Sequence, residues 1–96
     1  MWFGTDDVRW NAKVNKQLEK LPSYIREKFY FWVFNIGTLG LRNTRVISGF
    51  HDEPLKGNRS GQRSVRLNRS YRVIYVQMED ESSLYILVIE VNKHEY

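Results

Sequence analysis

The sequence contains no cysteine, only two histidines, and no apolar run long enough to cross a bilayer. Without cysteine there is neither a disulfide framework nor a thiolate zinc site. A membrane-spanning helix needs about 20 apolar residues in succession. The first ten residues, MWFGTDDVRW, lack the cationic and apolar regions of a signal peptide. We therefore expect a soluble, cytoplasmic protein with no membrane association.

The chain is short but rich enough in apolar residues to fold. It has 96 residues, of which 42% are hydrophobic and 15% aromatic. This length suits one domain around one core, and the composition is not that of a disordered tail. No repeat, low-complexity tract or linker divides the sequence. We expect a single domain over residues 1–96.

Hydrophobic spacing predicts two helices in the first half of the chain. The first lies in NAKVNKQLEKL and ends near Pro22. Ser23 is the expected N-cap of the second helix, which ends at Gly37 or Gly40. The second helix includes the run FYFWVF, which is apolar on every side, so some of its aromatics should stay exposed and suit a protein partner. The apolar positions that define the two helices are Val14, Leu18, Leu21, Ile25, Phe29, Trp32 and Ile36.

The second half of the chain has the pattern of strands. A short first strand is expected at residues 8–10, and residues 41–61 carry turn chemistry that leaves room for one helical turn. Three strands follow, at about residues 62–67, 71–78 and 84–91. The order β-α-α-β-β-β predicts an α+β fold in which two N-terminal helices pack on one face of a small antiparallel, twisted sheet.

Positive charge is concentrated rather than abundant. The net charge is only +4, but residues 56–72 contain six basic side chains and no acid. If residues 68–70 form a three-residue loop, Arg66 faces Arg72 across a hairpin, with Val65, Leu67, Tyr71, Val73 and Tyr75 on the other face. Two arginines about 5 Å apart repel each other unless an anion lies between them. A phosphate fits this requirement, because a guanidinium fork matches its oxygens.

Two other interpretations of the arginine pair stay open. The side chains are solvated or pair with acids of the third strand, such as Glu90. Alternatively, a two-residue turn puts Leu67 opposite Arg72 and separates the arginines.

The last strand brings a titratable group toward the same face. Glu90, Asn92 and His94 share one side if the strand stays extended, with Leu87, Ile89 and Val91 on the other. Neighbouring arginines lower the pKa of an imidazole, so His94 beside a phosphate site could move a proton. Tyr96 could stack on a base or hold it through its hydroxyl. The alternative is a C-terminal histidine with no role.

The stretch RLNRSYRVIY, together with the terminal VNKHEY, resembles the RelE/ParE superfamily of type II toxin–antitoxin toxins, nearest to its RelE- and HigB-like members. The segment PLKG at residues 54–57 resembles the family's pre-strand segment. The resemblance implies a RelE-like fold and an endoribonuclease that cuts messenger RNA in the ribosomal A site. It also implies a cognate antitoxin that binds the toxin in a hetero-oligomer and keeps it inactive.

The resemblance also implies roles for individual residues. Arg72 corresponds to the arginine that stabilises the scissile phosphate, Arg66 to a basic residue of the preceding strand, and His94 to the catalytic position after the last strand. Ser64 stands where some members have a lysine general base, so the second acid/base group is open. Expected contacts to RNA are Lys56, Arg59, Arg63, Arg69 and Tyr96.

The residue types fit metal-independent RNA cleavage, because the RNA supplies its own 2′-hydroxyl nucleophile. No cofactor is expected, and the two histidines show no ligand spacing. His51-Asp52-Glu53 reads as a solvated loop, with His51 as a weak candidate for the second proton transfer. Two alternative functions remain: a ParE-like toxin that inhibits gyrase without cleaving RNA, and a basic RNA-binding module.

Overall fold

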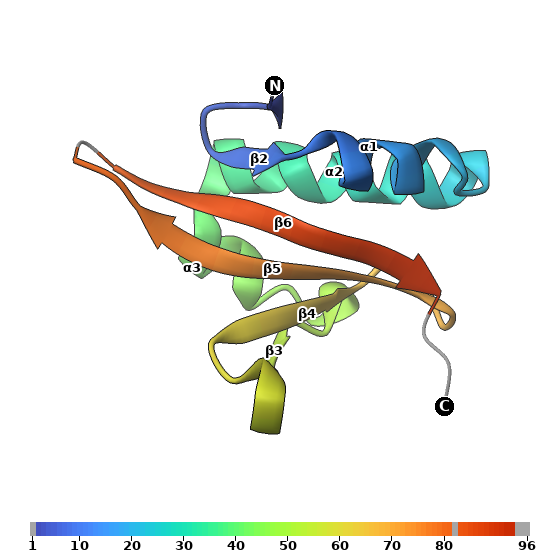
Figure 1. The fold of residues 1–96 in the computed structure, drawn as a ribbon. Helices are drawn as coiled ribbons and strands as arrows, with labels where there is room; N and C mark the ends of the chain where they lie inside the picture. Colours follow the sequence, from blue (N-terminus) through green and yellow to red (C-terminus); the bar gives the residue numbers. More distant parts are fainter. Residues whose placement is uncertain (1, 82, 94–96) are drawn as a thin grey trace.

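The structure is a computed structural model that describes residues 2–81 and 83–93. Two helices and then a short third helix precede the main strands in the chain (Figure 1). Two single 3-10 turns lie in the connection, at Ser48–Phe50 and Gly57–Arg59. The helices are α1 (Ala12–Glu19), α2 (Ser23–Leu39) and α3 (Leu41–Arg45). The strands are β1 (Phe3–Gly4), β2 (Val8–Trp10), β3 (Glu53–Pro54), β4 (Gln62–Arg66), β5 (Tyr71–Glu79) and β6 (Leu84–Lys93).

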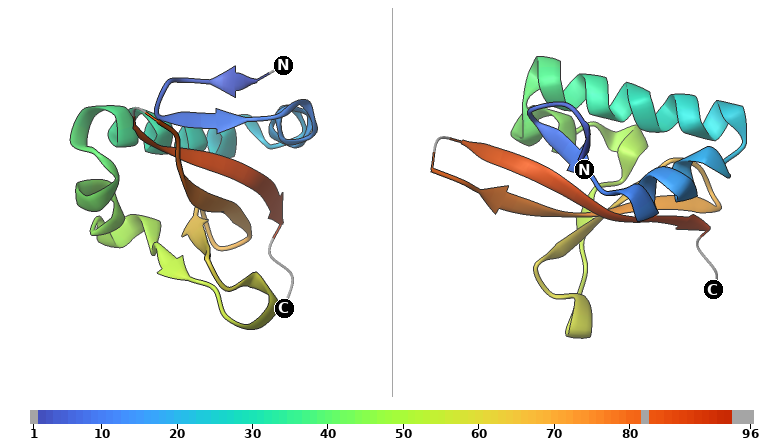
Figure 2. Two further views of the ribbon diagram at one scale, coloured as in Figure 1. Left: turned by 60° about the vertical axis from the view of Figure 1, so that its left-hand side comes forward. Right: turned by 45° about the horizontal axis from the view of Figure 1, so that its top comes forward.

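The strands form one sheet in the order β1-β2-β6-β5-β4-β3. Helices α1 and α2 lie together on one side of the sheet (Figures 1 and 2), which confirms the predicted α+β architecture. All pairings are antiparallel except the one between β2 and β6, which is parallel. The sequence did not predict β1 and β3, because two residues are too few to show a strand period.

The helix boundaries follow local capping chemistry. The side chain of Asn11 caps α1 by accepting a hydrogen bond from the Val14 N–H at 3.0 Å. Pro22 is the N-cap of α2, so the expectation that Ser23 caps this helix is wrong; Ser23 is its first helical residue. Gly40 ends α2 with φ 82°, a conformation that costs other residues more.

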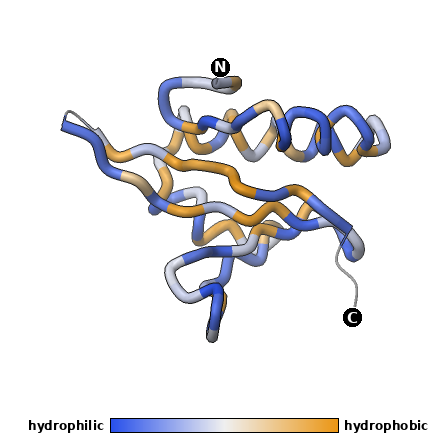
Figure 3. The backbone as a smooth tube through the Cα atoms, viewed as in Figure 1, coloured by the Kyte–Doolittle hydropathy of each residue, from blue (hydrophilic) through white to orange (hydrophobic). Residues whose placement is uncertain are grey.

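The core lies between the helices and the sheet. The Trp32 ring of α2 packs on the Tyr75 ring of β5, with the ring centroids 5.5 Å apart. Apolar residues follow the middle of β5 and β6, whereas the hairpin turns are hydrophilic (Figure 3). All seven predicted apolar helix positions are buried, as are Val65, Leu67, Val73 and Tyr75, and Tyr71 packs against this core.

A bulge in the sheet changes which residues of β6 face the core. Ile74 pairs with Glu90, but the next residue, Tyr75, pairs with Val88, so Ile89 is an extra residue on β6. The alternation of side chains therefore reverses, and Ile86, Val88 and Val91 are buried. The prediction that Leu87 and Ile89 share a core face with Val91 is wrong for this reason. No helix in the described part of the chain is long and apolar enough to cross a membrane.

Candidate functional site

The hairpin between β4 and β5 places two arginines opposite each other. Arg66 and Arg72 are register partners, as predicted. The loop has three residues: the Leu67 N–H donates to the Tyr71 carbonyl at 2.9 Å, and the Asn68 side-chain oxygen accepts from the N–H groups of Ser70 and Tyr71 at 2.8 Å each. This loop excludes the two-residue alternative and fixes the register of the pair.

Arg72 is held in a defined orientation. Its side chain is only 8% exposed, and its Nη1 donates to the Ser64 hydroxyl at 2.9 Å. Ser64 is itself buried. Because Arg72 is buried and hydrogen-bonded, its guanidinium fork is preorganised rather than free to rotate.

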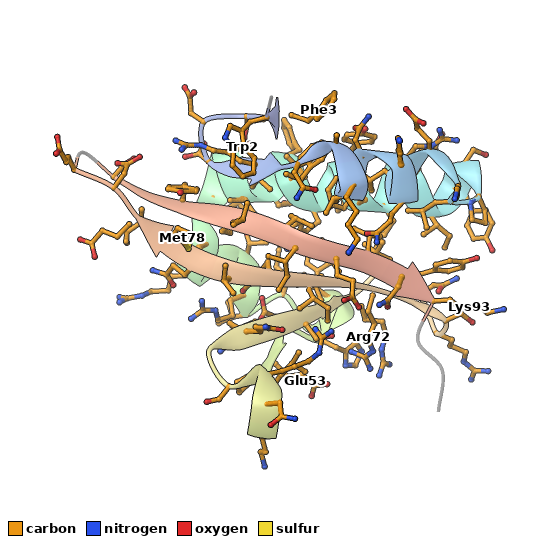
Figure 4. The ribbon with its side chains drawn as sticks, in the orientation of Figure 1. Trp2, Phe3, Glu53, Arg72, Met78 and Lys93 are labelled. Carbon is orange, nitrogen blue, oxygen red and sulfur yellow. The ribbon has the colours of Figure 1, made fainter. Side chains whose placement is uncertain are left out.

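The Glu53 carboxylate forms an ion pair with Arg72. Strand β3 places Glu53 opposite Ser64, and Glu53 Oε1 lies 3.6 Å from Arg72 Nη1. Figure 4 shows both side chains on the side of β5 toward β3, away from α1 and α2. The Glu53 side chain is 59% exposed, so its attraction to Arg72 is screened by water. A ligand therefore has access to the Glu53 carboxylate, beside which the largely buried Arg72 guanidinium lies.

The guanidinium group of Arg66 is a second positive charge opposite Arg72. Its Nε is buried and has no hydrogen-bond partner in residues 2–81 and 83–93, and no ion pair to Arg66 occurs in the same part of the chain. A buried N–H without a partner costs about 1–3 kcal/mol. The two like charges also repel across the strands. An anion between the two guanidinium groups offsets both costs.

The interpretation of residues 51–53 as a solvated loop is wrong for Asp52, whereas Glu53 is exposed as expected but belongs to strand β3. Asp52 is 1% exposed in its side chain. Its carboxylate accepts hydrogen bonds from Arg63 Nε and from the Tyr75 hydroxyl, each at 2.6 Å. Burial, reinforced by Asp52, raises the pKa of Tyr75. Asp52 thus attaches the segment before β3 to strands β4 and β5, and Glu53 follows it directly.

Sequence patterns could not identify Asp52 and Glu53, because β3 is too short to show a period and the surrounding residues are typical of turns. His51 is exposed, with φ 45°, and belongs to the loop as expected.

The other predicted RNA contacts fall into three groups. Lys56 and Arg69 are exposed. Arg59 is exposed but bonded to Gln62 at 2.9 Å and to Glu90 at 3.0 Å, so Glu90 pairs with Arg59 rather than with the arginine pair. Arg63 lies on the opposite face of β4 from Arg66 and is bound by Asp52, so the structure does not bring it to the site.

His94 and Tyr96 lie outside the described residues, and their roles stay predictions. The residues just before them are close to the site: Asn92 is the register partner of Arg72, and Lys93 is that of Tyr71. Glu90 and Asn92 share the face of Arg72, as predicted, and the Asn92 amide donates to the Glu90 carboxylate. In the described chain, no group of three or more His, Cys, Asp or Glu could hold a metal ion.

Several solved structures are similar to this chain in fold. A YoeB/ParE toxin from Agrobacterium tumefaciens is similar over 93% of this chain and 99% of its own, with 22% identity and a TM-score of 0.71. The toxin–antitoxin complex RelBE2 from Mycobacterium tuberculosis matches over 92% and 96%, with 22% identity and a TM-score of 0.64. The YoeB–YefM complex from Staphylococcus aureus matches over 93% and 97%, with 18% identity and a TM-score of 0.66.

No family model and no curated protein matches the sequence. The chain therefore has the fold of RelE/ParE superfamily toxins, and the fold is what this similarity establishes.

Proposed function

We propose that this chain is the toxin of a type II toxin–antitoxin pair and that it cleaves messenger RNA on the ribosome. The observation that carries the proposal is the opposition of Arg66 and Arg72 with the Glu53 carboxylate 3.6 Å from Arg72. The site thus combines two guanidinium groups, which can bind a phosphate, with a carboxylate, which can accept a proton. A protein that only bound gyrase or RNA would not need this combination.

The reaction begins at the 2′-hydroxyl of the RNA. Glu53 takes its proton, and the oxygen attacks the adjacent phosphorus. Arg72 and Arg66 stabilise the charge on the pentacoordinate phosphate. The bond from phosphorus to the 5′-oxygen breaks, and that oxygen leaves with a proton. The products are a 2′,3′-cyclic phosphate on one fragment and a 5′-hydroxyl on the other.

Two groups have complementary parts in proton transfer. We assign the role of general base to Glu53. The sequence left this role open, because Ser64 occupies the position where the resemblance implies a lysine. We assign to His94 the role of general acid, which donates a proton to the leaving 5′-oxygen. His94 follows Lys93, the last residue of β6. The nucleophile belongs to the RNA, and the charge on the phosphate is met by two guanidinium groups, so the proposed mechanism uses no metal or other cofactor.

RNA backbone contacts complete the proposed interface. Lys56, Arg59 and Arg69 are exposed, and we assign them to phosphates along the RNA strand, with Tyr96 stacking on a base. Arg63 instead positions β3 through Asp52. Such an interface, together with the absence of a membrane-spanning helix among the described residues, suits a cytoplasmic protein working on ribosomes.

An antitoxin is the expected protein partner. The outer side of α2 exposes four aromatic rings, Tyr24, Tyr30, Phe31 and Phe34. Exposed aromatics of this kind suit a protein interface. Two of the structurally similar proteins are toxin–antitoxin complexes, which supports an antitoxin for this chain.

Expression of the chain in growing cells tests the proposal. We expect growth arrest together with new 5′ ends inside translated transcripts, and no change in plasmid supercoiling. Arg72→Ala should abolish both the arrest and the new ends at equal protein level. Intact transcripts with failed supercoiling would instead identify a gyrase inhibitor, and growth without either effect would remove the toxin function.

A further inference from the structure

A hollow lies at the other end of β5 from Arg72. Its volume is about 450 Å³, and it lies between the C-terminal end of α2, helix α3 and the β5–β6 hairpin. Gln77 of β5 lines it, five residues after Arg72, which is about 17 Å along a strand. Figure 4 shows Arg72 and Met78 toward opposite ends of β5. The hollow is therefore a separate site, which we call the α3 cavity.

The walls of the α3 cavity are largely apolar. Ile36 and Ile86 are buried residues of its lining, whereas Leu39 and Leu84 are exposed. Exposed leucines beside a hollow of this size are typical of sites that bury an apolar group of a ligand or partner.

Two arginines give the α3 cavity a positive rim. Arg42 and Arg45 are three residues apart on α3, so they lie on one side of the helix. Neither forms an ion pair within residues 2–81 and 83–93. Arg45 Nε is buried and has no hydrogen-bond partner in that part of the chain. The Arg45 guanidinium also lies beside the Tyr75 hydroxyl, so the exposed Arg42 is the arginine of the rim that is open to a ligand.

One carboxylate also lines the α3 cavity. Among the described lining residues, Asp7, in the loop before β2, is the only acid. Two cations and one anion leave a net positive charge, and the Asp7 oxygens can accept from an N–H group. A peptide offers all three complements: an apolar side chain, a carboxylate and backbone N–H groups.

We propose that the α3 cavity binds a segment of a protein partner in which a bulky apolar side chain stands next to a carboxylate. The apolar side chain fills the cavity, the carboxylate meets Arg42, and a backbone N–H of the segment donates to Asp7. An acidic segment also complements the +4 charge of the chain. That the partner is the antitoxin rests on the proposed function. The antitoxin then has an anchor that leaves the arginine pair open to a second segment.

Peptide binding tests the site without any need for catalysis. The probe is a capped heptapeptide, Ala-Glu-Glu-Leu-Phe-Glu-Ala, added to the full chain labelled with ¹⁵N. We expect amide shifts to change at Leu39, Arg42 and Leu84 and to stay constant at Arg66 and Arg72. Arg42→Glu should weaken binding at least about tenfold through lost charge-assisted hydrogen bonds, and Leu84→Ala should weaken it by a similar factor. Lys20→Glu, an exposed change at the end of α1, is the matched control.

Two further peptides make the outcome decisive. Replacing the three glutamates by lysine, or the Leu-Phe pair by alanine, should each abolish the shifts. Equal binding of either peptide, shifts elsewhere, or no binding of the acidic probe would overturn the proposal. The proposed function fails separately: a chain that binds the probe but cleaves no RNA keeps the α3 cavity as a peptide site, and a chain that cleaves RNA but ignores the probe loses only this site.

Discussion

The Glu53 carboxylate lies 3.6 Å from the Arg72 guanidinium. The two residues come from β3 and β5, with Ser64 of β4 between them as register partner of Glu53 and hydrogen-bond partner of Arg72. A proton acceptor beside a phosphate-binding cation is what attack by a 2′-hydroxyl requires. The predictions below separate the roles of the residues that build this arrangement.

Replacement of Glu53 by glutamine tests the general base. Glu53→Gln keeps the size of the side chain but cannot take a proton, so we expect single-turnover RNA cleavage to slow by about 10²–10⁴-fold. RNA affinity should not fall, because the change removes a negative charge next to Arg72. The matched control is Glu27→Gln on the exposed side of α2, which should cleave normally. A Glu53→Gln enzyme as fast as the wild type would reduce Glu53 to an ion-pair partner of Arg72.

The guanidinium fork of Arg72 is tested by a change that keeps its charge. Arg72→Lys retains one positive charge but loses the planar pair of donors, so the rate should fall by about 10²–10³-fold. Thermal unfolding should show that the variant is folded, since lysine keeps a flexible aliphatic chain and the positive charge at this buried position. Lys13→Ala, at an exposed position of α1, serves as the control. Full activity of Arg72→Lys would mean that charge alone is needed there.

The buried carboxylate of Asp52 is predicted to position β3. In Asp52→Asn one of its two hydrogen bonds is lost or reversed, so the free energy of unfolding should fall by about 1–3 kcal/mol. Hydrogen exchange at residues 53–56 should also speed up more than exchange in β5, and cleavage should slow because Glu53 is no longer held near Arg72. Asp6→Asn, at an exposed acid, should change none of these. Unchanged exchange at β3 would contradict the positioning role.

The raised pKa of Tyr75 predicts a loss of stability at alkaline pH. The native state keeps the phenol proton above the ordinary pKa of 10.0, whereas the unfolded chain releases it. This contribution is complete below about pH 10 and decreases as the pH rises from there toward the native pKa. Urea unfolding at about pH 9 and about pH 11 should show a smaller loss in Tyr75→Phe than in the wild type, by up to about 1.4 kcal/mol per pH unit. Tyr24→Phe, at an exposed ring, should behave like the wild type.

Two features of the structure could be predicted from the sequence, one from hydrophobic periodicity and one from the length of a three-residue loop. The stripe of α2 and the opposition of Arg66 and Arg72 both follow from regular spacing, and both are confirmed. The bulge at Ile89 is not visible in the sequence, because one extra residue in a strand leaves a continuous apolar run. The predicted side-chain alternation of β6 is therefore wrong on one side of the bulge.

Long-range pairing explains what the sequence could not predict about the site. Asp52 and Glu53 look like turn residues, and only the pairing of β3 with β4 brings them to Arg63 and Arg72. Arg63 lies on the face of β4 opposite to Arg66 because side chains alternate along the strand, and Asp52 binds it there. The number of basic residues in a segment does not show that one of them, Arg63, pairs with a buried carboxylate.

The most direct test of the account is the chemistry of the cut. A messenger RNA carrying a single 2′-deoxy nucleotide immediately 5′ to the mapped cleavage position, translated in the presence of the purified chain, lacks the proposed nucleophile at that position only. The account predicts cleavage of the all-ribose messenger with 2′,3′-cyclic phosphate and 5′-hydroxyl ends, and no cleavage at the deoxy position. Undiminished cleavage at the deoxy position, or ends carrying a 5′-phosphate, would contradict it.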